Sequence, residues 1–571
     1  MYKLKEIIIQ RFYTEGIVSN SLAILVGILT GIVFVFYEQA TFFATRFFFG
    51  KNWGISWYVI VLPAFGGLLI GLLSHRLSNK RCGIPDVIEA TALHGGKIPA
   101  INAFYEVFLS IISISTGGSV GKEAPGVLAG TGVGSSVAGF LKSPDNRFRT
   151  LISCGASGGI AAAFNAPLAG VVFVVEVIIG KLESKTFIPV VLSAVFAALV
   201  STIVFKANPI QVSYYGLVDP LLELVLYVIL GAFAGIVSVI LIKTTYFSHD
   251  IFQKMPTHPI LKPAIGGLGV GFIGYSYPQV FGIGYATITS ALEGELVITL
   301  LIYLLILKII AFSLTVGSGG SGGAIVPSLF VGSMMGGAFG IIVNVLFPAS
   351  TAPSGAYALV GMGAVFAGTA HAPLTAMLIL FELTRDYNLI LPLMAACVIS
   401  KTISSSLQGD SIFTETLRRR GHSIRDGTEI NVMEAMKVSD NMVKDVLTLN
   451  ENDTAADLLR LMQKSKHAGF PVLNQNGQLV GIVTLHDMRD KVPHGELGKL
   501  IKTIATKDVV TAYPDESLDV VLKRLAARDI GRLPVVSRGK PDKLLGIITR
   551  SDIVKSYNRE IIARNQQNKP K

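Results

Sequence analysis

Long apolar runs constrain the fold of this chain more than any other feature. Only 15% of the residues are charged, whereas soluble domains carry about 25% charged residues. A helix needs roughly 17–25 apolar residues to cross the hydrocarbon core of a bilayer. Runs of that length lie at 21–37, 57–73, 187–205, 221–242 and 297–314. The sequence therefore predicts a polytopic membrane protein.

The net charge of +11 is compatible with a nucleic-acid binder, but a membrane protein gathers lysine and arginine on its cytoplasmic side. Basic clusters at 74–81, 142–149 and 415–425 fit that second explanation. We therefore expect a lipid bilayer and no nucleic acid as partner, and a plasma-membrane location with both termini in the cytoplasm. The N-terminus predicts no cleavable signal, and the 3 cysteines predict no disulfide framework.

Composition changes near 418–430, where the apolar, glycine-rich chain becomes an ordinary soluble mixture. Residues 470–490 and 533–554 then repeat one pattern: a Pro-Val strand, a polar turn and Leu-x-Gly-Ile-hydrophobic-Thr-x-x-Asp. An amphipathic helix precedes each copy. The two copies resemble a pair of cystathionine-β-synthase (CBS) modules, which form a cytoplasmic dimeric α/β unit. We expect a membrane domain at 1–418, a linker at 419–431, modules at 432–492 and 500–558, and a disordered tail at 559–571.

The apolar part also repeats. Residues 155–177 and 361–383 match at a constant offset, and residues 122–134 match 324–336. The first pair shares Ala-Pro-Leu and a later glutamate, which are Ala166, Pro167, Leu168 and Glu176 in one copy and Ala372, Pro373, Leu374 and Glu382 in the other. Repeated halves with interrupted apolar segments are typical of transporters whose site lies where broken helices meet.

Two glycine-rich breaks, GGSVGKEAPG (117–126) and GSGGSGGAIVP (317–327), lead into a proline and an apolar helix. A helix that begins inside a membrane has unpaired N–H groups and a positive dipole end, and an anion is the natural partner of such an end. Close packing of small residues explains most of the 59 glycines. It does not explain two matched breaks, one of which carries the carboxylate of Glu123.

Several motifs together resemble the chloride channel and transporter (CLC) family. They are CGIPD (82–86), GKEAP (121–125), NAPLAG (165–170), GGAIVP (322–327) and QGDSIFTETL (408–417). The resemblance implies homodimers, an anion pathway in each subunit and chloride as the transported ion, with no enzymatic activity. The expected fold is an all-α polytopic membrane domain of two inverted repeats with broken helices, followed by the α/β CBS pair.

The resemblance makes Glu123 the gating residue, whose carboxylate occupies the outer anion site and leaves when it is protonated or displaced. An acid inside a membrane protein is a functional candidate by default. By the same resemblance, the backbone amides of Gly121, Lys122 and Glu123 line the outer anion site. Those of Ala324 and Ile325 contribute to the central one.

Three positions depart from the family pattern. Cys82 stands where many relatives carry a serine, and a thiol is a weaker donor than a hydroxyl. Phe413 stands where relatives usually carry a tyrosine, so a second hydroxyl is missing. Val177 occupies the place of the inner glutamate of proton-coupled relatives. Glu176, which Glu382 repeats, has a structural role in this interpretation.

We therefore expect a passive anion channel gated by Glu123, with weak central anion binding and fast, poorly selective permeation. A chloride/proton antiporter with a different inner proton route is the alternative, because some exchangers lack the inner glutamate. Fluoride-specific relatives also change the serine position, but they differ around the gate, so a fluoride transporter is not favoured. A magnesium transporter lacks support, since carboxylates suited to that ion are missing from the apolar segments, and no metal site is expected.

CBS pairs often bind adenosine nucleotides, for which a threonine and an aspartate contact phosphate and ribose. GIVTLHD (481–487) and GIITRSD (546–552) supply this pattern twice. The nucleotide-binding candidates for ATP, ADP or AMP are Thr484, Asp487, Thr549 and Asp552, with His467, Arg532 and Arg550 as phosphate contacts. The alternative is an empty pair that only dimerises.

Overall fold

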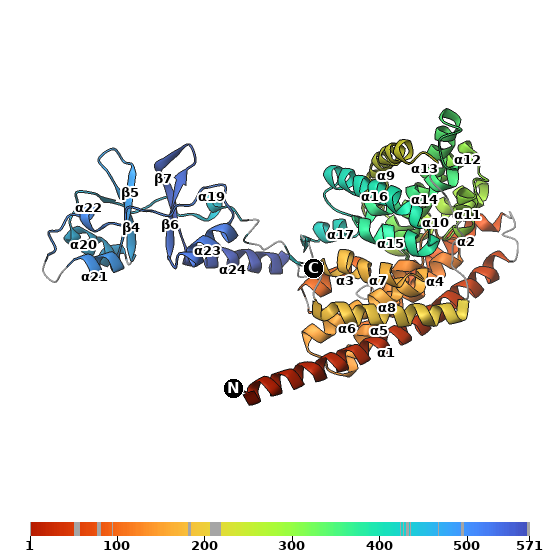
Figure 1. Cartoon of the computed structure of the whole chain (residues 1–571), viewed down its shortest axis with the longest axis horizontal. Coiled ribbons are helices and arrows are strands. Elements are labelled where there is room, and N and C mark those ends of the chain that lie inside the picture. The colour runs from red at the N-terminus through yellow and green to blue at the C-terminus, as the bar shows by residue number, and fades with distance from the viewer. Residues whose placement is uncertain are drawn as a thin grey trace. The chain divides into compact units, whose positions relative to one another are not determined.

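The computed structural model divides into two compact units, Met1–Thr428 and Glu429–Lys571 (Figure 1). It describes residues 2–50, 57–76, 81–93, 95–180, 184–205, 218–422, 424–425, 428–429, 433, 436–465, 467–492 and 496–567. Parts of the basic cluster at 74–81 and of the expected linker at 419–431 lie outside these described residues. We call Met1–Thr428 the membrane unit, and Glu429–Lys571, which contains the two predicted CBS modules, the CBS unit.

Among the described residues, 7 helices are long and apolar enough to cross a membrane. These spans are Gly16–Phe49, Tyr58–Arg76, Thr186–Val204, Pro220–Lys254, Ile298–Gly317, Ile325–Leu346 and Tyr387–Leu407. Each contains an apolar stretch of about the length that a bilayer requires. The expected all-α membrane domain is confirmed.

The described residues of the first half of the membrane unit form eight α-helices and one π-helical turn. They are α1 (Tyr2–Phe49), α2 (Tyr58–Arg76), α3 (Ile84–Leu93), α4 (Ala100–Ser115), α5 (Glu123–Phe140), α6 (Asp145–Phe164), α7 (Pro167–Phe173), η2 (Val174–Ile179) and α8 (Ser184–Phe205).

Residues 218–422, all of which are described, form nine α-helices and three short 3₁₀ turns in the second half. They are α9 (Pro220–Lys254), η3 (Pro259–Leu261), α10 (Lys262–Ser276), η4 (Pro278–Val280), α11 (Tyr285–Leu292), α12 (Ile298–Gly317), α13 (Ile325–Leu346), α14 (Ser354–Ala370), α15 (Pro373–Thr384), η5 (Tyr387–Leu389), α16 (Ile390–Leu407) and α17 (Thr414–Arg419).

The backbone repeats where the sequence repeats. Helix α6 ends at Asn165 with φ 54° and ψ 39°, and α14 ends at His371 with φ 55° and ψ 34°. This left-handed conformation is uncommon for residues other than glycine, so its recurrence at matched positions is specific. A proline then starts α7 and α15 alike, as expected at a first helical turn. The predicted repeat of the two halves is thus present in three dimensions.

Glu176 and Glu382 cap each other's halves. Helix α7 and helix α15 both begin with amides that lack intrahelical partners, and the glutamate of the opposite half accepts from them. The bonds run to Glu176 from the amides of Leu374 (3.1 Å) and Thr375 (2.8 Å), and to Glu382 from those of Leu168 (3.0 Å) and Ala169 (2.8 Å). A carboxylate at a helix start also complements the helix dipole. The structural role expected of Glu176 is therefore explained.

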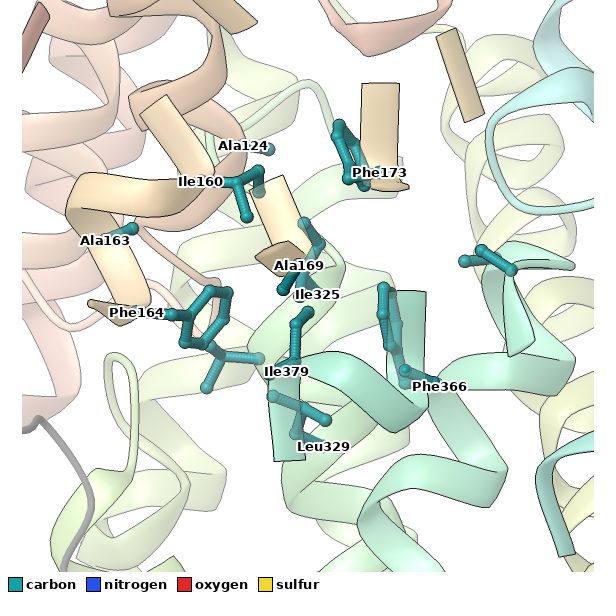
Figure 2. Packing of buried hydrophobic residues seen from close by; sticks show 14 of the residues in the cluster. Ala124, Ile160, Ala163, Phe164, Ala169, Phe173, Ile325, Leu329, Phe366 and Ile379 are labelled. Carbon is teal, nitrogen blue, oxygen red and sulfur yellow. The ribbon is translucent and has the colours of Figure 1, made fainter. Parts of the chain in front are cut away.

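Apolar side chains from both halves form one continuous core in the membrane unit. Figure 2 shows part of it, where Ala169 and Phe173 of the first half gather with Ile325 and Ile379 of the second. Ile325, the first residue of α13, is fully buried there. The start of this broken helix is therefore fixed by packing.

The CBS unit contains two strand systems side by side with helices outside them (Figure 1). In the first, β3 (Leu449–Asn450) pairs parallel with β4 (Gly469–Leu473), which pairs antiparallel with β5 (Leu479–Thr484). In the second, β6 (Arg532–Ser537) pairs antiparallel with β7 (Lys540–Thr549), and a parallel bridge from Ala512 to Val535 takes the place of β3. The predicted α/β pair is confirmed.

The remaining helices of this unit are α19 (Val438–Asn441), α20 (Ala455–Ser465), α21 (Leu485–Lys491), α22 (Ile501–Ile504), α23 (Leu518–Ala527) and α24 (Arg550–Gln567). The two-residue strands β1 (Ile424–Arg425) and β2 (Thr428–Glu429) lie around the residue at which the chain is divided into units. Helix α24 continues to Gln567, although the sequence predicted a disordered tail from residue 559. The segment up to Gln567 contains neither glycine nor proline, so nothing in it terminates the helix.

The two CBS modules exchange their leading segments. Val438 of α19 belongs to the apolar core of the second module, and Ile501 and Ile504 of α22 belong to that of the first. Antiparallel bridges from Val443 to Ile547 and from Thr506 to Ile482 accompany this exchange. Each apolar core therefore contains a residue from the leading segment of the other module, and the boundaries at 432–492 and 500–558 stay a prediction.

Candidate functional site

The two glycine-rich breaks meet. Gly121 and Gly323 form an antiparallel bridge in which each N–H donates to the other's carbonyl at 2.9 Å. Helices α5 and α13 begin two residues after these glycines, at Glu123 and Ile325. The bridge therefore brings two positive helix ends together inside the membrane unit, as an anion site requires.

The bridge also changes which amides are free to bind an anion. The N–H of Gly121, which the sequence placed in the outer site, donates to the carbonyl of Gly323. It therefore cannot bind an anion in this arrangement. The amides of Lys122 and Glu123 lie at the start of α5, where a helix leaves its N–H groups without intrahelical partners. They remain the expected backbone ligands.

The carboxylate of Glu123 lies at this junction and is fully buried. Its Oε1 accepts a hydrogen bond of 2.5 Å from the hydroxyl of Tyr285, the first residue of α11. Its Oε2 has no hydrogen-bond partner among the described residues, and a Cβ added to Gly121 would lie 2.6 Å from it. Burying a carboxylate with one unsatisfied oxygen costs free energy. The contacts around Glu123 must therefore offset that cost for its side chain to stay in this position.

Two cavities approach the junction. The first, which we call the Cys82 cavity, measures about 660 Å³ and is lined by Cys82, Ala124 and Ala324 among others. The second, the Tyr285 cavity, measures about 460 Å³ and is lined by Tyr285 and Lys122 among others. The residues on either side of Glu123 thus face different cavities. Glu123 itself lines neither cavity; it is fully buried and lies between these two residues along the chain.

The Cys82 cavity is lined by two of the three positions that depart from the family pattern, Cys82 and Phe413. Cys82 contributes a thiol whose recorded contact is with the carbonyl of Gly83, at 4.0 Å. Phe413 lines the same cavity with a ring that donates no hydrogen bond. A hydroxyl does lie nearby, that of Tyr246 on α9, but it contacts the carbonyl of Ile412 and the hydroxyl of Thr416, both at 2.7 Å.

Arg81 lies beside Cys82 and connects two segments that line this cavity. Its guanidinium donates to both carboxylate oxygens of Glu106 on α4, at 2.9 and 2.8 Å. It also donates to the carbonyls of Gly319 and Gly320, at 2.8 and 3.2 Å. The charge of Arg81 is thereby paired, and the segment that leads into α13 is tied to α4.

The Tyr285 cavity has an ion pair on its wall. The ammonium of Lys122 donates to Glu38 on α1 and lies 5.2 Å from the centre of the Tyr285 ring. Glu38 and Tyr285 were not identified from the sequence. Glu38 follows directly on an apolar run, and an ionisable residue in such a place is a usable signal. Tyr285 lies 162 residues from Glu123 with no local signal.

Val177 lies in η2, next to Glu176, and packs against the apolar core. An aliphatic side chain in that place neither accepts nor donates a proton. Both oxygens of Glu176 are engaged with the start of α15, and Thr375 adds a hydroxyl bond of 2.7 Å. Val177 thus packs in the apolar core, and Glu176 caps the start of α15.

The nucleotide candidates of the two CBS modules have different surroundings. Asp487 accepts from the amide and hydroxyl of Thr484 on one oxygen, and from Lys491 and Thr506 on the other, at 2.8 and 3.0 Å. Burial acts to raise the pKa of Asp487, but the hydrogen bonds from Lys491, Thr484 and Thr506 outweigh it and lower that pKa. Both oxygens of this carboxylate are thus engaged within the module.

Asp552 repeats only half of that arrangement. Its Oδ2 accepts from the amide and hydroxyl of Thr549 at 3.0 and 2.7 Å, and no bond to its Oδ1 is recorded among the described residues. Of the three expected phosphate contacts, Arg532 donates to the carbonyl of Gly469 at 2.7 Å, and Arg550 donates to that of Ile530 at 3.2 Å. His467 packs near Phe470, with ring centres 6.5 Å apart.

Comparison with known proteins agrees with these two units. The family model described as voltage gated chloride channel matches residues 66–405, and the CBS domain model matches residues 435–494 and 501–559. A relative from Ralstonia nicotianae, the putative chloride channel protein ClcB-like, is 32% identical over 64% of this chain and 86% of its own length. Chloride channel protein CLC-f of Arabidopsis thaliana is 28% identical over 90% of this chain and 75% of its own.

Solved structures show the same fold. A slow cyanobacterial Cl⁻/H⁺ antiporter superposes with a TM-score of 0.65 at 24% identity, over 70% of this chain and 97% of that one. A eukaryotic CLC transporter superposes with a TM-score of 0.63 at 21% identity, over 94% of this chain and 97% of that one. This chain is therefore an integral membrane protein of the voltage gated chloride channel (CLC) family, with a CBS domain pair after its membrane unit.

Proposed function

We propose that this protein is a passive chloride channel in which Glu123 is the gate. The observation that carries the proposal is the place of its buried carboxylate, at the meeting of two helix starts, where its chain neighbours Lys122 and Ala124 line different cavities. A carboxylate there occupies the position that an anion would otherwise take. It competes with chloride as long as it is ionised and in place.

Opening follows from removing that competitor. Protonation cancels the charge of Glu123, and a sufficiently high chloride concentration displaces it. The Tyr285 cavity is the outer entrance in this proposal, and the Cys82 cavity is the inner one. Basic residues at the wall of the Cys82 cavity, among them Arg419 and Arg420, support a cytoplasmic side there.

Weak central binding follows from the chemistry of the Cys82 cavity. A hydrogen bond to a charged partner contributes about 1.5–3 kcal/mol, and the two side-chain positions offer a thiol and a ring. The hydroxyl of Tyr246 is already engaged with Ile412 and Thr416. Chloride therefore passes this point with little retention, which favours fast and poorly selective flux.

The assembly is a homodimer with one pathway in each subunit, in a plasma membrane, with the CBS pair in the cytoplasm. We further propose that adenosine nucleotides bind the CBS pair and regulate flux. The second module is the better candidate site, because Asp552 retains an oxygen for ribose hydroxyls while both oxygens of Asp487 are engaged. Calorimetry of the full-length protein with ATP, ADP and AMP tests this, and absence of heat from all three would leave the pair a dimerisation unit.

The test of the gate is simultaneous chloride and proton flux from liposomes that contain wild-type protein, Glu123→Gln or Glu223→Gln. Glu223 is a matched control because it is also buried in the membrane unit, where it accepts from the amides of Val218 and Ala352. We expect chloride flux without proton transport, rising as pH falls. Glu123→Gln holds flux at the acid level at every pH, whereas Glu223→Gln behaves as wild type.

The result that contradicts the channel is proton uptake driven by a chloride gradient. Proton uptake that disappears in Glu123→Gln would identify a chloride/proton antiporter whose inner proton route avoids Val177. If neither pH nor the Glu123→Gln substitution changes chloride flux, Glu123 is not the gate.

A further inference from the structure

The hydroxyl of Tyr285 lies where a ligand of the transported anion would lie. It donates to Oε1 of Glu123 at 2.5 Å, and Tyr285 is the side-chain partner recorded for that carboxylate. A carboxylate oxygen and a chloride ion are both acceptors that require donors. A donor that holds the carboxylate in the anion's place is therefore within reach of the anion that replaces it.

We propose that Tyr285 is a chloride ligand of the outer site, whose hydroxyl turns from Glu123 to chloride when the gate opens. This inference rests on the proposed function, in which Glu123 takes the place of the anion. It adds a side chain to a site that sequence motifs describe by backbone amides alone. The same hydroxyl thus contributes to both the closed and the open state.

The loop before Tyr285 is built to hold this hydroxyl still. Gly284 has φ +85°, a conformation that glycine adopts without strain, and a Cβ there would come within 2.8 Å of Phe330. Lys308, a fully buried lysine on α12, donates to the carbonyls of Val280 and Gly282 at 3.0 and 2.9 Å. Ser119, just before the gate, donates to the same carbonyl of Val280 at 2.8 Å.

This loop is therefore tied both to α12 and to the segment that carries Glu123. A buried lysine is expensive, and here the loop carbonyls receive its hydrogen bonds. Lys308 is a positioning residue in this account, since it acts on the anion through the loop and Tyr285. Rigid placement of a donor reduces what must be ordered when the ligand binds.

Chloride can reach the hydroxyl from the Tyr285 cavity. Tyr285 and Lys122 both line it, and the Lys122 ammonium 5.2 Å from the ring centre adds positive charge to the approach. At the central position, by contrast, Cys82 and Phe413 supply little. Side-chain recognition of the anion has thus moved outward, from the central position to Tyr285.

The experiment uses full-length protein that already carries Glu123→Gln, so that the gate no longer competes. Chloride affinity is measured by calorimetry and by the chloride dependence of liposome flux. We expect Tyr285→Phe to weaken chloride binding at least about tenfold, because a hydrogen bond to a charged ligand is lost. The matched control is Tyr37→Phe. Tyr37 is a buried tyrosine whose hydroxyl accepts from Ser110 at 3.2 Å, and this substitution leaves affinity unchanged.

The outcomes separate this inference from the proposed gate. Unchanged chloride affinity in Glu123→Gln/Tyr285→Phe, together with faster flux in Tyr285→Phe alone, would make Tyr285 a latch only and overturn the inference while the gate stands. A Glu123→Gln protein without any change in flux or pH dependence would instead overturn the gate. If Tyr285→Phe does not assemble, 3-fluorotyrosine at position 285 keeps the size and strengthens the donor. It must then tighten chloride binding, and looser or equal binding would overturn the inference.

Discussion

The two helix breaks of the membrane unit have nearly the same backbone and different side chains. Before α5, Lys122 has φ −89° and ψ −11°; before α13, Ala324 has φ −91° and ψ −12°. The residue that follows is Glu123 in the first break and Ile325 in the second. One is a fully buried acid, and the other is part of the apolar core.

This difference separates two roles of the repeated breaks, which are supplying positive helix ends and, in the proposed function, gating. The positive ends of both helices come from the backbone, so both halves can supply them with any side chain that permits the turn. Gating requires a charge that competes with the anion, and one such charge suffices. Under the proposed function the second half therefore needs no acid, and Ile325 instead packs into the apolar core at the junction.

The largest expected effect is a change in chloride flux when either glycine of the bridge is replaced by alanine. The two replacements should change the flux in opposite directions. In Gly323→Ala the new Cβ meets the Cβ of Ala124 at 2.7 Å and its backbone nitrogen at 3.1 Å. Neither atom can rotate away, so the start of α5 must shift. We expect a loss of about 1–3 kcal/mol in stability and a fall in liposome chloride flux of at least roughly tenfold, since 1.4 kcal/mol of lost anion stabilisation is about tenfold.

Gly121→Ala is the matched control and has the opposite sign. Its new Cβ lies 2.6 Å from Oε2 of Glu123, the mobile end of a side chain, and 3.2 Å from Pro327. The methyl group displaces the Glu123 carboxylate, so under the proposed function we expect flux to rise toward that of Glu123→Gln. Equal losses of flux in both variants would show that the two breaks are equivalent and would remove the distinction drawn here.

The next effect concerns the two capping glutamates. Glu176→Ala and Glu382→Ala each remove the acceptor of two helix-start amides, and a lost cap costs about 0.5–2 kcal/mol. We expect each variant to lower the temperature at which purified protein loses its monodisperse elution, with a smaller drop for the corresponding glutamine substitutions. A drop confined to one of the two would mean that the capping is not symmetric in energy.

A third comparison uses the other repeat, the CBS pair. We expect Asp552→Asn to weaken nucleotide binding about tenfold, as measured by calorimetry on full-length protein, and Asp487→Asn to leave it unchanged. Asp487→Asn should instead destabilise the CBS unit, because four hydrogen bonds converge on that carboxylate. Reversed roles would contradict the assignment of the binding site to the second module.

The Asp487 effect has a defined pH window. The pKa of Asp487 is lowered in the folded protein, so its contribution is present above the unfolded value of about 3.9 and is lost as pH falls through the lower folded value. The stability difference between wild type and Asp487→Asn, measured by chemical denaturation, should be constant near neutrality and shrink in acid. A difference that grows in acid would exclude this origin.

The smallest expected effect concerns a hydrogen bond that is present in the Glu176 cap and has no counterpart in the Glu382 cap. Thr375 gives Glu176 an additional hydroxyl bond of 2.7 Å, whereas Ala169 occupies the matched place next to Glu382. We expect Thr375→Ala to cost about 0.5–1.5 kcal/mol in thermal unfolding. Ala169→Thr should recover a similar amount if its hydroxyl reaches Glu382, and no cost from Thr375→Ala would mean that the amide bonds alone set the stability.

The sequence was sufficient for features that are encoded locally and twice. Glycine-to-proline breaks and the paired Glu176 and Glu382 identified both halves, because each motif specifies its own turn or helix start. The general position of Glu123 followed, since an ionisable residue stands out in an apolar segment.

Other features depend on contacts between distant segments and had no such signal. The bond from Gly121 to Gly323 is set by the register in which the two breaks meet. Tyr285 reaches Glu123 across 162 residues, and GIGYATITS around it is typical of many turns into a helix. The exchanged leading segments of the CBS modules were missed for the same reason, because Val438 and Ile501 pack on cores formed elsewhere in the chain.

The crossed glutamates described with the fold bear on how this protein can work at all. Tilting one half of the membrane unit as a rigid body against the other would withdraw Glu176 from α15 and Glu382 from α7 at once, and would strand two acids and four amides in a low-dielectric interior. Alternating exposure by rocking is thereby penalised. Under the proposed function, opening then requires only the movement of single side chains at the junction, a scale at which ions can pass without the scaffold moving.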